Sequence, residues 1–232
     1  MTGAGETPDE PVVRLSDLRF AYPATSFRLQ ISHWEVARGR QVAVIGPSGS
    51  GKTTLLHLIA GILRPTAGVV GVEGRRLDEL ADRELRAFRA RRIGMVFQDF
   101  QLLEYLDVRE NILLPYYIGT DLRISGDVRR RADELAAAVG LGDRMRRNVT
   151  RLSQGERQRV ALCRALITEP PLILADEPTG NLDPVNKRKI MALLQNHARR
   201  LGATLVVVTH DRDILSAMDR VVDFADWTAK VG

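Results

Sequence analysis

The sequence lacks long hydrophobic runs and contains a single cysteine in 232 residues. No apolar stretch approaches the roughly 18 residues that a membrane-spanning helix needs, and the longest, such as 172–175 and 205–208, have the length of strands. One cysteine excludes an intrachain disulfide and a zinc cluster. Because Cys163 lies among apolar residues, we expect it to be packed within a helix. These features fit a cytoplasmic protein.

The N-terminus also lacks the features of a targeting segment. Residues 1–11 are polar and acidic, with neither a basic start nor an apolar core, so we expect a disordered tail rather than a signal peptide or an anchor. Lysine is scarce, and arginine supplies most of the positive charge behind the net charge of +5. Basic surfaces can bind nucleic acid or anionic lipid. Here arginine alternates with Asp and Glu over residues 82–92, which favours solvated helix faces.

The order of apolar segments predicts an α/β fold. Two segments near the N-terminus alternate apolar and polar residues, as antiparallel strands do. Later strands are apolar throughout and alternate with helices, which is typical of a parallel sheet covered on both faces. The expected strands are 12–20, 27–36, 41–45, 69–73, 93–97, 172–175 and 204–208, and the main helices are 52–62, 82–91, 155–167 and 184–201.

The middle of the chain differs, because the Val- and Ile-rich runs disappear between residues 99 and 154. Residues 108–114 and 128–139 have the apolar spacing of helices. Met145 lies among arginines and is expected in a solvated turn. We therefore predict a single domain, 12–232, in which a helical subdomain, 99–154, is inserted into a core formed by 12–98 and 155–232.

A glycine-rich segment after the strand at 41–45 matches the phosphate-binding P-loop pattern G-x-x-x-x-G-K-[ST]. Glycine lets backbone N–H groups wrap a polyphosphate, and the helix that begins at Lys52 directs the positive end of its dipole toward it. We expect Lys52 to reach the β- and γ-phosphates of the bound nucleotide and Thr53 to ligate Mg²⁺. The predicted nucleotide-binding residues are Gly46, Pro47, Ser48, Gly49, Ser50, Gly51, Lys52, Thr53 and Thr54.

Two carboxylates end the apolar strand at 172–175. Asp176 is placed to hold the Mg²⁺ shell, and Glu177 lies one residue further, where a carboxylate can polarise an attacking water as general base. Considered alone, the pair is equally well explained as an ordinary acidic turn before Pro178. The P-loop makes nucleotide hydrolysis the stronger interpretation.

Further motifs resemble those of the ATP-binding-cassette (ABC) family. Leu152-Ser-Gln-Gly-Glu156 is similar to the family signature LSGGQ, from which Gln154 and Glu156 depart. The chain has similar elements in the family's order over nearly its whole length after residue 14. Beyond the signature these are the adenine-stacking aromatic at Tyr22, the Q-loop at Gln98, the D-loop at 181–183 and the switch histidine at His210.

The resemblance implies an ATPase with a P-loop NTPase (RecA-like) core that works as a homodimer around two ATP molecules. In such a dimer Ser153 and the backbone of Gly155 contact the γ-phosphate of the partner's ATP, and Asp183 links the two sites. Gln98 couples Mg²⁺ and water to the helical subdomain. The implied catalytic residues are Glu177, His210 and Gln98; the metal-binding residues are Thr53, Gln98 and Asp176; the nucleotide contacts outside the P-loop are Tyr22, Ser153, Gly155 and Asp183.

Within the family, residues 176–183 and 97–103 resemble subunits that work with permeases of the MacB, LolD and FtsE type. This resemblance implies docking on a separate integral membrane permease at the inner face of the cell membrane, with export, lipoprotein release or mechanical transmission as the output. Phe100, Leu102 and Leu103 are expected to be exposed and to receive the permease, although a local hydrophobic cluster is the alternative. No nucleic-acid partner is expected.

Two other functions compete with this interpretation. A soluble ABC ATPase acting on nucleic acid or ribosomes usually carries tandem cassettes, a long coiled coil or zinc inserts, and this sequence has one P-loop, no heptad run and one cysteine. A P-loop kinase leaves the signature motif unexplained. The transported cargo is not encoded here, because its recognition would belong to the permease.

Overall fold

The computed structural model describes residues 11–228, with gaps at residues 24, 120 and 181. Residues 1–10 of the expected tail and Asn181 of the expected D-loop lie outside the described residues. Pro11, which we had assigned to the tail, is instead the first residue of strand β1 (Pro11–Ala21), where it pairs with Ala37.

An antiparallel sheet forms the N-terminal part of the described chain. β1 pairs with β2 (Arg28–Ala37) on one side and with β4 (Ala67–Val72) on the other, and the short β5 (Arg75–Arg76) follows at the edge. In β2 the buried residues recur at Leu29 and Ile31, as the alternating sequence predicts. The predicted antiparallel pair is therefore confirmed.

Within the described residues a parallel sheet has the order β6-β7-β8-β3-β9. The predicted apolar strands account for four of its members. The fifth, β9, escaped prediction because it lies at the edge of the sheet and three of its four residues are exposed. The strands are β6 (Ile93–Val96), β7 (Leu172–Asp176), β8 (Thr204–Thr209), β3 (Gln41–Ile45) and β9 (Arg220–Asp223).

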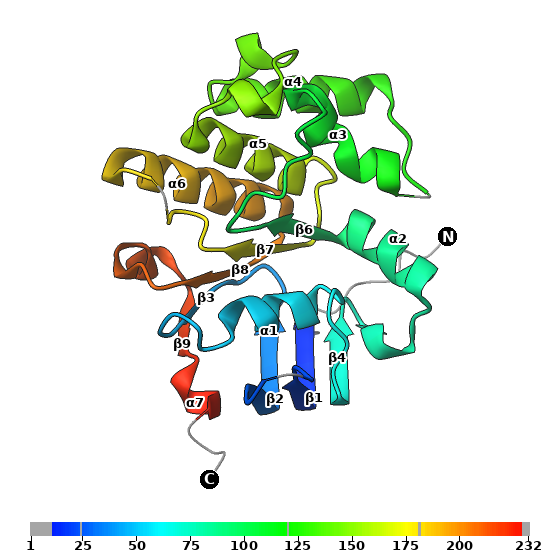
Figure 1. Cartoon of the computed structure of the whole chain (residues 1–232), viewed down its shortest axis with the longest axis vertical. Coiled ribbons are helices and arrows are strands. Elements are labelled where there is room, and N and C mark those ends of the chain that lie inside the picture. The colour runs from blue at the N-terminus through cyan, green and yellow to red at the C-terminus, as the bar shows by residue number, and fades with distance from the viewer. Residues whose placement is uncertain (1–10, 24, 120, 181, 229–232) are drawn as a thin grey trace.

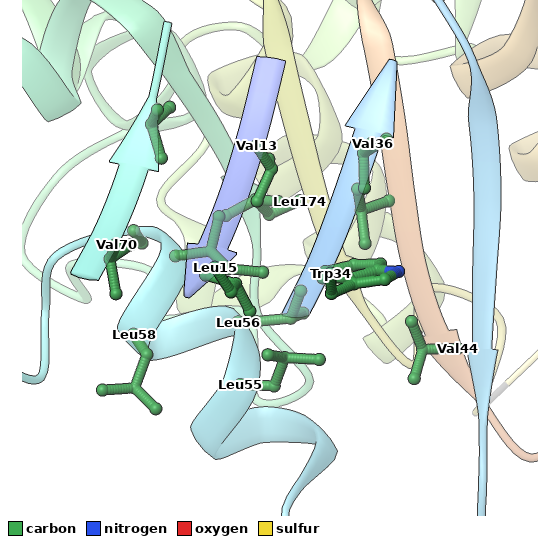
Figure 2. Packing of buried hydrophobic residues seen from close by; sticks show 14 of the residues in the cluster. Val13, Leu15, Trp34, Val36, Val44, Leu55, Leu56, Leu58, Val70 and Leu174 are labelled. Carbon is green, nitrogen blue, oxygen red and sulfur yellow. The ribbon is translucent and has the colours of Figure 1, made fainter. Parts of the chain in front are cut away.

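Both faces of the parallel sheet are buried, in two separate clusters. Leu174 and Val206 belong to the first cluster, while their neighbours Ile173 and Leu205 belong to the second. The first cluster also holds α1 (Lys52–Ile59), whose leucines pack near residues of the antiparallel sheet and the parallel sheet (Figure 2). Each fully buried leucine contributes roughly 1.5–3 kcal/mol, so this packing holds α1 against both sheets.

Helices cover the opposite face of the parallel sheet, in the upper half of Figure 1. Apolar residues of the expected helical subdomain join those of the core helices and the sheet in the second cluster. Met145 is 5% exposed and belongs to this cluster, so the predicted solvated turn was wrong. The helices here are α3 (Val108–Ile118), α4 (Gly126–Ala138), α5 (Gln154–Leu166) and α6 (Pro184–Leu201).

Shorter elements complete the described chain: α2 (Asp82–Arg92), which precedes β6, α7 (Ala225–Thr228), and 3-10 turns at Leu77–Glu79, Gly142–Arg144, Val149–Arg151 and Arg212–Ala217. None of the helices in the described ranges is long and apolar enough to cross a membrane. Cys163 is fully buried in α5, as predicted, and burial raises the pKa of its thiol to about 12.

Candidate functional site

The loop between β3 and α1 presents the N-terminus of a helix to a cavity. Gly51 caps α1 with φ 108°, which residues with a side chain rarely adopt, and a Cβ at this position would lie 2.5 Å from the Cζ atom of Phe27 unless that ring moved. No side chain caps α1 within the described residues, and its first turn contains no acidic residue. Its first N–H groups therefore lack a capping acceptor and can bind an anion.

Lys52 lies beneath this loop. Its Nζ atom donates hydrogen bonds to the carbonyl oxygens of Gly46 and Pro47, each at 2.8 Å, and the residue is 7% exposed. The nearby Ser50 hydroxyl is buried and meets no hydrogen-bond partner among the described residues. The loop thus holds a buried ammonium group and a buried free hydroxyl next to the helix N-terminus.

The loop lines a cavity of about 620 Å³ at the carboxyl ends of the parallel strands. Ligands of open α/β sheets bind at this edge. Gly46, Pro47 and Ser50 form the loop without lining the cavity. The lining residues are Tyr22, Thr25, Phe27, Ser48, Gly49, Gly51, Lys52, Thr53, Thr54, Gln98, Asp176, Glu177 and His210.

Aromatic rings form one wall of the cavity. The hydroxyl groups of Tyr22 and Thr54 are 3.2 Å apart, and the Tyr22 ring packs edge-on against Phe20 with ring centroids 4.8 Å apart. The ring centroids of Phe27 and Tyr22 are 5.8 Å apart, and Phe27 was not among the predicted site residues. Its sequence position looks like the start of β2, so its approach to Gly51 becomes visible only in three dimensions.

Asp176 ends β7 and is 5% exposed. Burial raises the pKa of its carboxyl group, the hydrogen bond with the Thr53 side chain lowers it, and the charge of Glu177 raises it. No cluster of three or more His, Cys, Asp and Glu side chains in the described ranges could hold a metal ion alone. A hydroxyl and a carboxylate fit Mg²⁺, which takes its other ligands from phosphates and water.

The backbone conformation of Glu177 is unusual, and three polar groups hold its carboxylate in place. Its backbone has φ 46°, a conformation that a side-chain-bearing residue rarely adopts. The carboxylate accepts hydrogen bonds from the Thr209 hydroxyl and the His210 backbone N–H, each at 3.1 Å, and the Nδ1 atom of His210 lies 2.7 Å away. The end of β8 therefore aims the carboxylate, while the His210 side chain remains 70% exposed.

Gln98 follows β6 and lines both this cavity and a neighbouring one of about 770 Å³. His57, whose pKa is lowered by burial, also lines the second cavity. The turn after Gln98 is strained, because Phe100 has φ 64° and Gln101 has φ 48°, which costs about 1–3 kcal/mol for each residue.

Two signature residues, Ser153 and Gly155, do not line this cavity, whereas Gln154 between them lines the neighbouring one with Gln98. Ser153 caps α5, and a reciprocal pair of hydrogen bonds joins it to Glu156: the Ser153 N–H donates to the carboxylate at 2.7 Å, and the Glu156 N–H donates to the hydroxyl at 3.4 Å. Arg144 forms an ion pair with Glu156. Neither Ser153 nor Gly155 lines the cavity that contains Lys52.

Asp183 also lies outside that cavity. It caps α6 by accepting hydrogen bonds from the N–H groups of Val185 and Asn186, and the bonds from Asn186 lower the pKa of its carboxyl group. The structure therefore brings together the predicted P-loop, Tyr22, Gln98, Asp176, Glu177 and His210. It does not bring Ser153, Gly155 or Asp183 to the same cavity.

The predicted exposure of Phe100, Leu102 and Leu103 was wrong. All three are half-buried, and Leu102 packs against the second cluster, because the turn after Gln98 folds back onto α5. A different groove of about 290 Å³, between α2, β6, α3 and α5, has apolar residues at its surface. Ile62 and Ile118 line it and are 41% and 67% exposed.

These features define a P-loop nucleoside triphosphatase, with an anion-binding helix end, a buried carboxylate beside a threonine hydroxyl and a second oriented carboxylate. The family model described as ABC transporter matches residues 29–180, and the chain belongs to this family. The predicted fold, ATP binding and ATPase activity are thereby confirmed, and the chain is the ATP-binding subunit of a transporter complex.

Relatives with similar sequences are transport proteins. The chain is 43% identical over 196 residues to the lipoprotein-releasing system ATP-binding protein LolD of Bacteroides thetaiotaomicron, covering 84% of this chain and 89% of that protein. It is 44% identical over 191 residues to the macrolide export ATP-binding/permease protein MacB of Rhodopirellula baltica, covering 82% of this chain and 28% of that longer protein.

A solved structure has a similar fold. It is the dimeric, post-hydrolysis state of the ATP-binding cassette MJ0796 bound to ADP and Pi, with a TM-score of 0.82 and 36% identity. The similarity covers 91% of this chain and 93% of that chain.

The raised pKa of Asp176 predicts that this residue destabilises the nucleotide-free protein. The unfolded chain releases this proton at an ordinary carboxyl pKa of roughly 4, whereas the folded chain holds it to higher pH. The free energy of unfolding therefore falls as pH rises from the pKa of the unfolded chain to the higher pKa of the folded chain, and it remains reduced at pH 7. We expect Asp176→Asn to raise the melting temperature at pH 7 without nucleotide, and the gain to shrink toward pH 4. An equal or lower melting temperature at pH 7 would contradict this prediction.

Proposed function

We propose that the chain binds Mg²⁺-ATP between two copies of itself and that hydrolysis drives a separate integral membrane permease. The observation that carries the proposal is the separation of Ser153 and Gly155 from the cavity that contains Lys52. Ser153 caps α5 and Gly155 lies in its first turn, and this helix N-terminus would bind the phosphate once the Ser153 hydroxyl gives up its bond with the Glu156 N–H. A second subunit could bring this helix end to the open side of the cavity, as the dimeric state of the similar cassette suggests.

Within one subunit, the P-loop would hold the phosphates. We expect Lys52 to exchange its bonds to the carbonyls of Gly46 and Pro47 for the β- and γ-phosphates. Thr53 and Asp176 would hold Mg²⁺, with Gln98 as a further oxygen ligand, and the raised pKa of Asp176 reflects a buried carboxylate that a cation would stabilise. When bound, Mg²⁺ would neutralise charge on the phosphates. Tyr22 would stack on the adenine.

Glu177 is our candidate for the general base. The Thr209 hydroxyl and the His210 N–H leave its carboxylate oriented toward the cavity. A carboxylate in this position can accept a proton from water as it attacks the γ-phosphate. The exposed imidazole of His210 would contact the γ-phosphate, and Asp183 would lie near the opposite subunit.

Replacing the base tests this assignment. Glu177→Gln keeps the size of the side chain and loses the ability to accept a proton, so we expect kcat to fall by about 100-fold or more, while ATP remains bound and the dimer accumulates. Turnover of radiolabelled ATP and size-exclusion chromatography with light scattering would measure the two effects. ATPase activity equal to that of the unmodified chain would remove Glu177 from this role.

The groove between α2, β6, α3 and α5 is the surface that we assign to the permease. Its lining is largely apolar, and it carries the guanidinium groups of Arg86, Arg89 and Arg164 with no carboxylate among its lining residues. Burial lowers the pKa of both Arg89 and Arg164, so these cations are poorly solvated. We therefore expect the docked segment to combine apolar residues with at least one acidic side chain.

This assignment places the subunit on the inner face of the cell membrane, held there by the permease. The MacB relative is named as an ATP-binding/permease protein, and this chain spans only 28% of it. The named activities of the relatives, lipoprotein release and macrolide export, support a transport role. We do not propose the nucleic-acid alternative, because no feature of the described chain favours it.

Charge reversal at the groove tests the docking surface. Arg86 is exposed and lines the groove, whereas Arg83 is exposed on the same helix and does not. We expect Arg86→Glu to lower recovery of the permease from detergent-solubilised membranes by about tenfold or more, because an acidic segment would meet a like charge. Arg83→Glu is the matched control and should leave recovery unchanged. Equal recovery with both variants would contradict the assignment.

A further inference from the structure

A buried arginine holds the turn that follows Gln98. The Nη2 atom of Arg164 donates to the carbonyl oxygen of Phe100 at 2.6 Å, and the Nη1 atom donates to that of Gln101. These carbonyls belong to the two consecutive residues with positive φ. One guanidinium therefore bonds to both peptide units of the strained turn.

The chemistry of this contact favours arginine over other residues. A planar guanidinium donates two parallel hydrogen bonds in a fixed geometry, which an ammonium group cannot match. Arg164 is 8% exposed, and burial lowers its pKa to about 10, while the charge of Asp99 raises it. Keeping a cation in so little water is costly, so its contacts with the turn are tightly specified.

Arg164 also connects three regions of the molecule. It lies on α5, the helix that begins directly after Ser153. It lines the groove assigned to the permease, together with Gln101. The turn that it holds begins directly after Gln98, which lines the nucleotide cavity. A displacement of α5 or of the groove would therefore reach the turn after Gln98 through the Arg164 side chain, in addition to the packing of α5 on β6.

We infer that Arg164 is a positioning residue that sets the location of Gln98 relative to α5, and that it affects hydrolysis through Gln98 alone. The inference rests on the proposed role of Gln98 in holding Mg²⁺ and water. Arg164 itself does not line the nucleotide cavity, so its loss should change kcat and leave nucleotide affinity nearly unaltered. If Arg164 had only a structural role, its replacement would lower the stability of the protein. Its effect on kcat would then not depend on the residue at position 98.

A double-mutant cycle separates these roles. The ATPase kinetics of the full chain would be measured for the unmodified protein, Gln98→Ala, Arg164→Gln and the double variant. We expect Arg164→Gln to lower kcat by about tenfold with less than a twofold change in KM for ATP. In the Gln98→Ala background the same change should cost less than about twofold, because residues that act through one another are not additive. Arg164→Lys should resemble Arg164→Gln.

Arg131 provides a matched control. It also donates to a backbone carbonyl, that of Ile167 at 3.0 Å just beyond the far end of α5, and its ion-pair partner is Glu169, which is not part of the turn. We expect Arg131→Gln to leave kcat unchanged, even if its melting temperature falls as much as that of Arg164→Gln. Equal loss of kcat in both arginine variants would contradict the inference.

The cycle also separates this inference from the function on which it rests. A fall in kcat for Gln98→Ala, together with additive effects in the double variant, would overturn the positioning role and leave the proposed function intact. An unchanged kcat for Gln98→Ala would overturn both the role of Gln98 and that of Arg164.

Discussion

The N-terminus of α1, open to the cavity at the carboxyl edge of the parallel sheet, is the feature on which the rest of the site depends. No side chain in the described chain caps it, and leucines on its inner face are locked between the two sheets. This packing holds the helix in place, so its N–H groups stay directed at the cavity where we propose that the phosphates bind. Gly51 has φ 108° in this loop, and a Cβ there would displace the Phe27 ring.

Around this site the protein contains buried charged groups and strained backbone conformations, which cost free energy when no ligand is bound. Asp176 is buried with a raised pKa, and Glu177 has a left-handed backbone. The turn after Gln98 adds two more residues with positive φ, and Arg164 must be buried to hold them. Strain and desolvation of this kind persist where function requires them. Phe100, Gln101 and Glu177 lie where the nucleotide cavity meets the helices above the sheet, which is where we propose that hydrolysis is coupled to the permease.

Local patterns in the sequence predicted much of the fold and the residues that line the cavity. Apolar runs marked the strands of the parallel sheet, and the P-loop pattern marked the start of α1. The contacts between distant segments could not be predicted, because no local pattern encodes them. Phe27 against Gly51 and Arg164 on the turn at Phe100 are examples. The prediction of a solvated turn at Met145 failed because its neighbours in the sequence are arginines, whereas its own side chain packs in the second cluster.

The central claim is that one chain holds only half of each ATP site, and dimerisation of Ser153→Arg tests it most directly. The measurement is light scattering with ATP in the Glu177→Gln background, with the exposed Ser216→Arg as the matched control. A large cation at the start of α5 would block the approach of that helix to the partner's nucleotide. The account predicts that Ser153→Arg binds ATP with nearly unchanged affinity and remains monomeric, while Ser216→Arg dimerises. A stable ATP-bound dimer of Ser153→Arg would contradict it.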